Sequence, residues 1–370
     1  MTLKIEVDIL RNAINSLLTV VDKKQTRQIL SYIHIKALPG QLHLEATDME
    51  VASKIILQAD VDNFGSFCVN AKNISDILRE LPNQKVELNY IIEKNSLEIK
   101  SGNIFFSILV LEPKEFPQVH FDEVKNSFEL DSTSLLDIIH KTSHAMSNDE
   151  ARLYLNGIYF QQIDHQLRTV ATDGYKLSLI DLDIDLQKNE SLANGVIVPK
   201  KGIFEFKKLC EENVGKKLKI YVNESYIFAM TNNHYISVRL IAKEYVRYQA
   251  VIPNKTSFTL SIDKITFIDS VKRIKIMSNE KSNGIKVKLD SNQMTISANN
   301  PGMGDAEEKL NINYSGKAME IGFNARFLLD ALAVLPNNEI ILEINNELSP
   351  IVIKSSNLPR YLGIIMPLKI

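Results

Sequence analysis

Gln166-Leu-Arg-Thr-Val-Ala-Thr-Asp173 has a counterpart on each side of it in the chain. Related segments occur 125 residues earlier, at residues 41–48, and 127 residues later, at residues 293–300. A second pattern keeps nearly the same spacing and occurs at residues 69–72, 198–201 and 323–326. Two independent patterns with one period indicate three copies of one domain. The polar stretches between copies place the expected domains at residues 1–126, 127–253 and 254–370.

Each copy contains two stretches with apolar residues at helical spacing, separated by short runs in which apolar and polar residues alternate. Helical periodicity predicts six helices, at residues 6–21, 74–81, 135–145, 203–209, 265–277 and 328–335. The alternating runs predict strands, and their connections are too short for helical crossovers, so we expect antiparallel sheets. The expected fold class is α+β, with two helices packed on antiparallel sheets in each of three repeated domains.

The composition is typical of a soluble globular protein, with 45% hydrophobic and 24% charged residues in a chain of 370. The formal net charge of −2 means that attraction to nucleic acid requires an uneven distribution of charge. Cys68 and Cys210 fall in different repeats without metal-ligand spacing. This argues against a disulfide and favours a reducing cytoplasm. No 18 uncharged apolar residues run together, so we expect no membrane partner.

The sequence contains no convincing catalytic constellation. Asp48 and Asp173 each follow a threonine, and Asn300 replaces them in the third copy, as expected for side chains that bond their own backbone in a turn. His140 and His144 are four residues apart on an expected helix, but no third ligand accompanies them. No phosphate-binding loop or nucleophile-and-base set is evident. We therefore expect a protein that is not an enzyme and needs neither metal nor cofactor.

Basic residues recur on or beside the expected helices of every repeat. A solvated helix face explains any one of them, but the whole set could line a surface that faces phosphates. The residues expected to face DNA are Lys24, Arg27, Lys72, Arg152, Lys200, Lys201, Lys272 and Arg273.

The number of helices limits how such a surface can surround a duplex. Six helices packed side by side in a circle leave a hole of about 9 Å, whereas twelve leave about 27 Å. B-DNA is roughly 20 Å wide. One chain is too small to encircle double-stranded DNA, but a head-to-tail pair of chains has the necessary circumference, and such a pair would also cover exposed sheet edges.

The chain resembles the bacterial sliding-clamp family, the beta subunit of the replicative DNA polymerase, over nearly its whole length. The resemblance rests on segments spread over the second and third repeats, at residues 152–157, 169–174, 196–202, 278–281, 298–301, 314–316, 319–324 and 366–370. It implies a homodimeric ring that a clamp loader places on double-stranded DNA without regard to sequence. It also implies partners such as the polymerase alpha subunit and other proteins with a clamp-binding motif.

The resemblance further implies a hydrophobic cleft for partner peptides between the second and third domains. Its residues by matching position are Leu155, Thr172, Gly174, Tyr175, Lys176, Leu177, Val251, Leu348, Ile364, Met366, Pro367 and Leu368. The chain departs from the family pattern at Tyr175-Lys176, Val246 and Ala250, where His-Arg, Pro and Arg are common. We expect these departures to change which residues are preferred beside the peptide's anchors.

For the dimer interface, the resemblance implies that Phe106 of one copy meets Ile276 and Met277 of the other. Around this apolar centre, Lys94 and Lys100 would face an acidic group formed by Asp305, Glu307 and Glu308. Two other functions remain open from the residues alone: a protein-interaction scaffold whose basic helices never meet DNA, and a hydrolase that uses Asp48 or Asp173.

Overall fold

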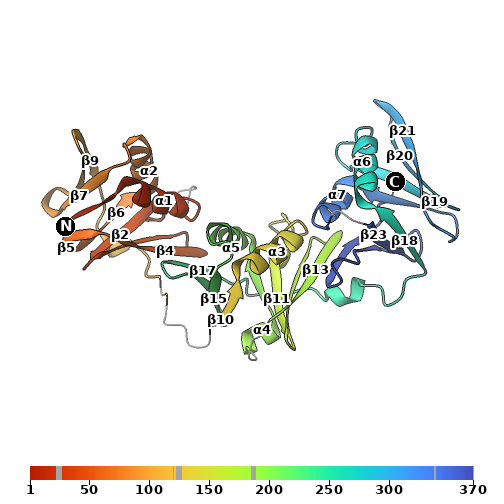
Figure 1. Cartoon of the computed structure of the whole chain (residues 1–370), viewed down its shortest axis with the longest axis horizontal. Helices are drawn as coiled ribbons and strands as arrows, with labels where there is room; N and C mark the ends of the chain where they lie inside the picture. Colours follow the sequence, from red (N-terminus) through yellow and green to blue (C-terminus); the bar gives the residue numbers. More distant parts are fainter. Residues whose placement is uncertain (22–26, 120, 122–126, 185–188, 337–338, 370) are drawn as a thin grey trace. The chain divides into compact units, whose positions relative to one another are not determined.

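The computed structural model describes residues 1–21, 27–119, 121, 127–184, 189–336 and 339–369. The chain forms two compact units, one of residues 1–133 and 204–240 and the other of residues 134–203 and 241–370. All pairings between the described strands are antiparallel, in four sheets, so the expected α+β class with antiparallel sheets is confirmed (Figure 1). No helix among the described residues is both long and apolar enough to cross a membrane.

The first unit contains a five-stranded sheet and an eight-stranded sheet. The five-stranded sheet has the order β5 (Asp60–Asn63), β1 (Thr2–Glu6), β7 (Lys85–Ile91), β8 (Ser96–Ser101) and β9 (Ile104–Leu109). The eight-stranded sheet has the order β10 (Phe128–Asp131), β15 (Lys217–Val222), β16 (Tyr226–Met230), β17 (His234–Arg239), β4 (Val51–Gln58), β3 (Gln41–Thr47), β2 (Tyr32–Leu38) and β6 (Gly65–Asn70). Strands of the first and second repeats thus share one sheet.

The second unit repeats this arrangement with a four-stranded and an eight-stranded sheet. The four-stranded sheet has the order β21 (Gly304–Asn311), β20 (Gln293–Asn300), β19 (Gly284–Asp290) and β22 (Met319–Asn324). The other has the order β14 (Val196–Pro199), β11 (Gly157–Ile163), β12 (Gln166–Thr172), β13 (Lys176–Asp183), β25 (Tyr361–Ile365), β24 (Ile351–Lys354), β23 (Glu339–Ile344) and β18 (Phe258–Asp263). Here strands of the second and third repeats share a sheet.

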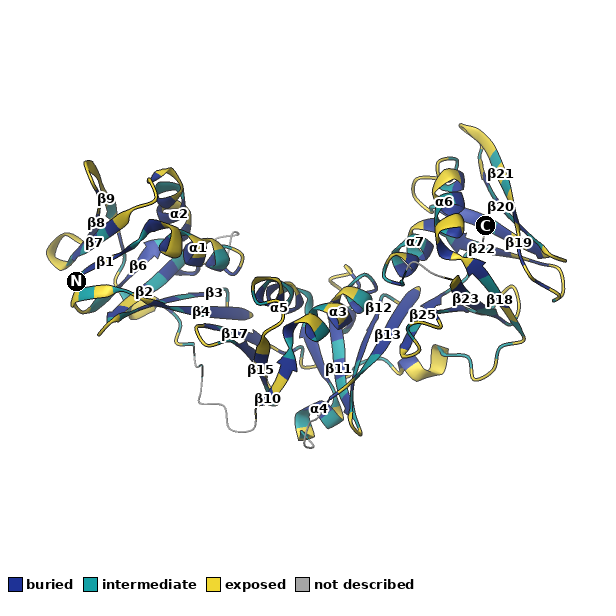
Figure 2. Cartoon of the chain, in the orientation of Figure 1, coloured by how far each residue is buried: buried dark blue, intermediate teal, exposed yellow. Residues whose placement is uncertain are grey.

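Among the described residues, α-helices occur at all six expected places, and one further short α-helix was not expected from the sequence. They are α1 (Val7–Leu17), α2 (Ala71–Glu80), α3 (Ser132–Ser143), α4 (Glu190–Asn194), α5 (Lys200–Glu212), α6 (Lys264–Lys275) and α7 (Ala325–Ala333). The unexpected helix, α4, is too short for periodicity to reveal it. Figure 2 shows that the helices bury one face and expose the other, and α1 buries Leu10, Ile14 and Leu17.

The second repeated pattern of the sequence marks the starts of helices. The Asn70 side chain accepts a hydrogen bond from the Asn73 backbone (3.1 Å) at the start of α2. Asn324 accepts from the Arg326 backbone (2.9 Å) at the start of α7. An asparagine in this position satisfies backbone N–H groups that have no partner inside the helix. The pattern therefore marks the start of a helix in every repeat, with an asparagine cap in the first and third copies and Pro199 at that position in the second.

Both cysteines are buried, and neither forms a disulfide. Burial raises the pKa of the Cys68 thiol, and likewise that of Cys210, to about 12. Thiols in such surroundings stay protonated and unreactive near neutral pH.

Candidate functional site

The Thr-Asp pattern of the second repeat forms a tight turn between β12 and β13. The Thr172 hydroxyl donates to the Lys176 carbonyl (2.7 Å). The Asp173 carboxylate accepts from the backbone N–H groups of Tyr175 (2.8 Å) and Lys176 (2.9 Å). Gly174 lies between them at a φ of +91°, a conformation that other residues adopt only with strain. The interpretation of Asp173 as a turn residue is confirmed, and its carboxylate is occupied by the backbone.

This turn forms one wall of a cavity of about 180 Å³ in the second unit. Its floor is buried and apolar, with Leu155, Leu177 and Ile364 each nearly inaccessible to solvent. Leu177 and Ile364 face one another in the register between β13 and β25. The Met366 N–H donates to the Tyr175 carbonyl (2.8 Å), which extends this pairing beyond the strand. A strand of the third repeat thereby completes a site that begins in the second repeat.

The structure gathers nine of the twelve residues expected in the cleft around this cavity. These nine are Leu155, Thr172, Gly174, Tyr175, Lys176, Leu177, Val251, Ile364 and Met366. The other three lie outside its lining. Leu348 is 77% exposed, Pro367 follows Met366, and the Leu368 N–H donates to Gly322 (2.8 Å) on β22.

Three lining residues were not among the expected cleft residues: Val246, Arg247 and Tyr248. They precede or begin a short 3-10 helix, Tyr248–Val251, in the segment that leads to the third repeat. Tyr248 is buried and belongs to the apolar cluster of Leu177 and Ile364. The sequence signal for these residues is the aromatic and apolar run beside Val246. Connections between domains are usually polar, so an apolar run there indicates a buried contact.

Lys176 contributes little free charge to the cleft. Its ammonium lies 3.1 Å from the Asp330 carboxylate and 4.7 Å from the centre of the Phe327 ring, both on α7. Nearby, burial and the Lys176 charge lower the pKa of His144 to about 4. Lys176 therefore ties the turn to α7, and an apolar floor remains as the main feature available to a ligand.

The cleft offers a ligand mainly an apolar floor and extended backbone. Asp173 is held by backbone groups. Among the described residues, no three His, Cys, Asp or Glu side chains lie close enough together to hold a metal ion. An apolar floor next to extended backbone is instead suited to an extended peptide with aliphatic or aromatic anchors.

The residues expected to face DNA are distributed over both units. Arg27 and Lys72 are exposed in the first unit, and Lys24 lies outside the described residues. In the second unit, the Arg152 guanidinium contacts Asp149 (2.8 Å), and Lys200 donates to Asn148. Lys201 is next to Lys200 at the start of α5 and is partly exposed.

Both α6 residues that were expected to face DNA have acidic neighbours. Lys272 lies 3.8 Å from Asp269. Arg273 makes two hydrogen bonds to the Glu308 carboxylate (3.0 and 2.6 Å), and this contact lowers the pKa of Glu308. An expected DNA-facing residue is therefore paired with an expected interface residue. In the single chain, the Arg273 and Glu308 side chains therefore pair with each other.

The residues expected at the dimer interface lie on or near two sheet edges. Phe106 lies on β9, which among the described strands pairs only with β8 and is exposed along nearly its whole length (Figure 2). Asp305, Glu307 and Glu308 lie on β21, whose one partner in the described part of the chain is β20. Ile276, just after α6, is 68% exposed, and Met277 beside it is partly exposed. Each unit thus presents one open edge with apolar side chains on it or close to it.

Three family models match the chain in succession. They describe the DNA polymerase III beta subunit: its N-terminal domain at residues 1–120, its central domain at residues 129–247 and its C-terminal domain at residues 249–369. These matches follow the three sequence repeats.

Named relatives and solved structures agree with these models. The chain is 30% identical to the beta sliding clamp of Pseudomonas aeruginosa, with 95% of each chain covered. It is also 30% identical to the beta sliding clamp of Caulobacter vibrioides, with both chains fully covered. The crystal structure of the Pseudomonas aeruginosa DNA polymerase III subunit beta superposes with a TM-score of 0.94, at 28% identity over the whole of both chains.

Proposed function

We propose, from the premise that this chain belongs to the DNA polymerase III beta subunit family, the bacterial sliding clamps, that two copies join head to tail in a ring around duplex DNA. A sliding clamp is a processivity factor, which keeps a polymerase on its template and catalyses no reaction itself. The ring, its contacts and its cleft are the parts of this function that we infer for this chain.

The observation that carries the ring is the presence of two open sheet edges with complementary side chains. β9 exposes Phe105, Phe106 and Leu109, and Lys100 lies above the Phe105 ring at 5.8 Å. β21 carries Asp305 and Glu307, and both lie in the stretch of β21 that pairs with β20. A long, exposed apolar edge favours pairing with another chain. In our proposal, β9 of one copy lies against β21 of the other, and the second contact closes the ring.

The basic helix residues supply the sequence-independent contact with DNA. Arg27 and Lys72 from the first unit, with Lys200, Lys201 and Lys272 from the second, face phosphates across the ring. Lys24 lies outside the described residues, and we include it on the basis of the sequence alone. Such contacts hold the duplex without reading its bases. Arg273 and Arg152, which already have carboxylate partners, contribute less to this surface.

The cleft in the second unit binds the peptide motifs of the polymerase alpha subunit, the clamp loader and other clamp-binding proteins. Support comes from the apolar floor of Leu155, Leu177 and Ile364 beside the exposed turn at Tyr175. Leu348, Pro367 and Leu368 then act outside the cavity, on flanking residues of the peptide. The domains follow the repeats, at residues 1–126, 127–253 and 254–370, and the cytoplasm is the proposed location.

A topological test separates a ring from an ordinary DNA-binding protein. The protein is loaded on nicked circular DNA by a clamp loader, and the complex is separated by gel filtration before and after the circle is linearised. We expect retention on the circle and loss from the linear form, because a ring can slide off an end. Equal retention on both forms would rule out encirclement. A protein that is never retained, although it binds polymerase, would favour the scaffold function.

A further inference from the structure

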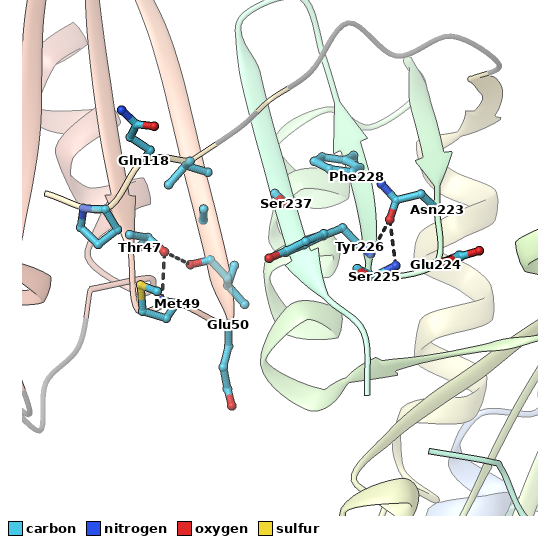
Figure 3. Close-up of a pocket in the computed structure, with 14 residues that line it drawn as sticks. Thr47, Met49, Glu50, Gln118, Asn223, Glu224, Ser225, Tyr226, Phe228 and Ser237 are labelled. Carbon is cyan, nitrogen blue, oxygen red and sulfur yellow. Dashed lines mark hydrogen bonds between the residues drawn. The ribbon is translucent and has the colours of Figure 1, made fainter. Parts of the chain in front are cut away.

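We propose that the first unit contains a second peptide-binding cleft, built from the first and second repeats as the cleft above is built from the second and third. It is the cavity of about 520 Å³ shown in Figure 3. This inference rests on the proposed peptide-binding role of the first-described cleft. We call the cavity of Figure 3 the I–II cleft and the other the II–III cleft.

The turn that forms one wall is the same in both clefts. The I–II cleft is lined by Thr47, Met49, Glu50, Val51 and Ala52. Adding 125 to each number gives the five turn residues that line the II–III cleft, which are Thr172, Gly174, Tyr175, Lys176 and Leu177. The repeat spacing found in the sequence therefore relates the two walls residue by residue.

The hydrogen bonds of the two turns also match. The Thr47 hydroxyl donates to the Val51 carbonyl (2.9 Å) and accepts from the Met49 N–H (3.0 Å). Asp48 accepts from the backbone of Glu50 (3.0 Å) and Val51 (2.8 Å). Met49 has a φ of +78°, close to the +91° of Gly174. The local backbone of the first turn is thus the same, although a methionine occupies the glycine position.

The strand that completes each cleft comes from the next repeat in the same register. Ala52 on β4 faces Ser237 on β17, as Leu177 on β13 faces Ile364 on β25. The Arg239 N–H donates to the Glu50 carbonyl (2.8 Å), just as the Met366 N–H donates to Tyr175.

The connecting segment after each repeat forms the third wall. Pro117, Gln118 and Val119 line the I–II cleft, and the segment from Val246 to Val251 lines the II–III cleft. All three walls of one cleft therefore have a counterpart in the other. The I–II cleft has the larger volume, about 520 Å³ against about 180 Å³.

The side chains of the I–II cleft define its ligand. Its buried floor includes Val51 and Phe228, and Tyr226 is partly exposed. Figure 3 shows Tyr226 extending from β16 across the cavity toward β4. Met49 adds a flexible apolar side chain at the rim, which can adapt to different anchors. These residues favour an aliphatic or aromatic anchor of an extended peptide.

Charge distinguishes the two clefts. The charged residues that line the I–II cleft are Glu50 and Glu224, and both are exposed. Those that line the II–III cleft are Lys176 and Arg247. The occupant of the I–II cleft is therefore a partner-protein peptide with lysine or arginine beside its apolar anchor. One clamp could then hold two different partners on the same chain.

The test uses three fluorescent octapeptides that share a central Leu-Phe pair and carry two lysines, two serines or two aspartates on the flanks. Binding is measured by fluorescence anisotropy with the full chain. Val251→Arg blocks the II–III cleft, and Tyr226→Arg added to it blocks the I–II cleft as well. Both positions are partly exposed, so the folded chain tolerates them, which circular dichroism checks. Glu50→Gln with Glu224→Gln, in the Val251→Arg background, tests charge alone.

We expect the lysine peptide to bind the Val251→Arg protein, with the serine peptide weaker and the aspartate peptide weakest. Adding Tyr226→Arg should weaken the lysine peptide at least tenfold, and the two glutamine substitutions should weaken it by about threefold to tenfold. The proposal is overturned if Val251→Arg alone abolishes binding of the lysine peptide, if Tyr226→Arg has no effect, or if the aspartate peptide binds best. If the serine peptide does not bind the unmodified chain, that result instead counts against peptide binding in the II–III cleft.

Discussion

The turn residues Asp48 and Asp173 show how an acidic side chain can stabilise a backbone turn where the sequence alone also allows a catalytic role. Each carboxylate accepts two backbone N–H groups at 2.8 to 3.0 Å through its Oδ1, so each side chain holds its own turn together. The repeated Thr-Asp pattern alone predicted this, because residues that bond their own turn need no partner elsewhere.

We predict that Asp173→Ala lowers the free energy of unfolding by about 1–2 kcal/mol, because two backbone donors lose their acceptor. Asp173→Asn should be nearly neutral, since the amide oxygen can still accept. Chemical denaturation of both variants measures the difference. The asparagine variant should also keep DNA loading and polymerase stimulation. Loss of those activities in a stably folded Asn variant would revive the hydrolase hypothesis.

Burial of the His144 side chain should make the stability of the protein depend on pH. Burial and the nearby Lys176 charge lower its pKa to about 4, against the opposing effect of Asp330. Its Nδ1 has no hydrogen-bond partner in the described part of the chain. In the unfolded chain the imidazole binds a proton below about pH 6.5. The native state therefore gains stability from neutral His144 above that pH and loses it as the pH falls toward 4.

Replacing His144 with leucine should flatten this part of the stability profile. The full difference corresponds to about 3 kcal/mol between pH 7 and pH 4. His140→Leu is the matched control, because His140 is exposed and lies on α3, which ends just before His144. Urea denaturation at several pH values compares the two. An unchanged slope in the His144 variant would mean that its imidazole is charged in the native state.

At the scale of elements, the structure departs most from what repeats alone imply. Three equal sequence copies suggest three separate cores, yet β4 pairs with β17, and β13 pairs with β25. Alternating apolar residues predict a strand, but they do not specify which repeat supplies its neighbour, because backbone hydrogen bonds are the same for any partner. Both clefts form where these shared sheets meet a connecting segment. For this reason Arg247 and Tyr248 were not expected from the sequence.

Open edges at β9 and β21 lead to a prediction about assembly. Ile276→Asp with Met277→Asp should convert the proposed dimer to a folded monomer, because carboxylates beside the apolar β9 edge of the other copy would have to be desolvated. Light scattering should report one chain mass, with circular dichroism unchanged. Leu153→Asp is a control, since Leu153 is an exposed apolar residue that lies on neither edge strand. A dimer that survives the double substitution would refute this interface.

At the scale of the whole molecule, function depends on the distribution of charge rather than its sum. The net charge of −2 gives no general attraction to DNA. Reversing Lys200, Lys201 and Lys272 to glutamate tests the helix residues and leaves the Arg273–Glu308 pair intact. The control reverses three strand lysines with acidic partners, Lys85, Lys217 and Lys286. Both variants change the net charge equally, so any difference between them reports position.

Each phosphate contact contributes about 0.9 to the slope of log affinity against log salt. Loss of three contacts should therefore reduce that slope by about 3 for the helix variant on short linear duplex. The strand variant should keep the slope of the unmodified protein. Anisotropy titrations at several salt concentrations measure both, and primer extension measures processivity. If the two variants lose affinity equally, the helices do not face DNA, and the function would be that of a scaffold. A selective loss in the helix variant, with peptide binding retained, would place the duplex against these helices.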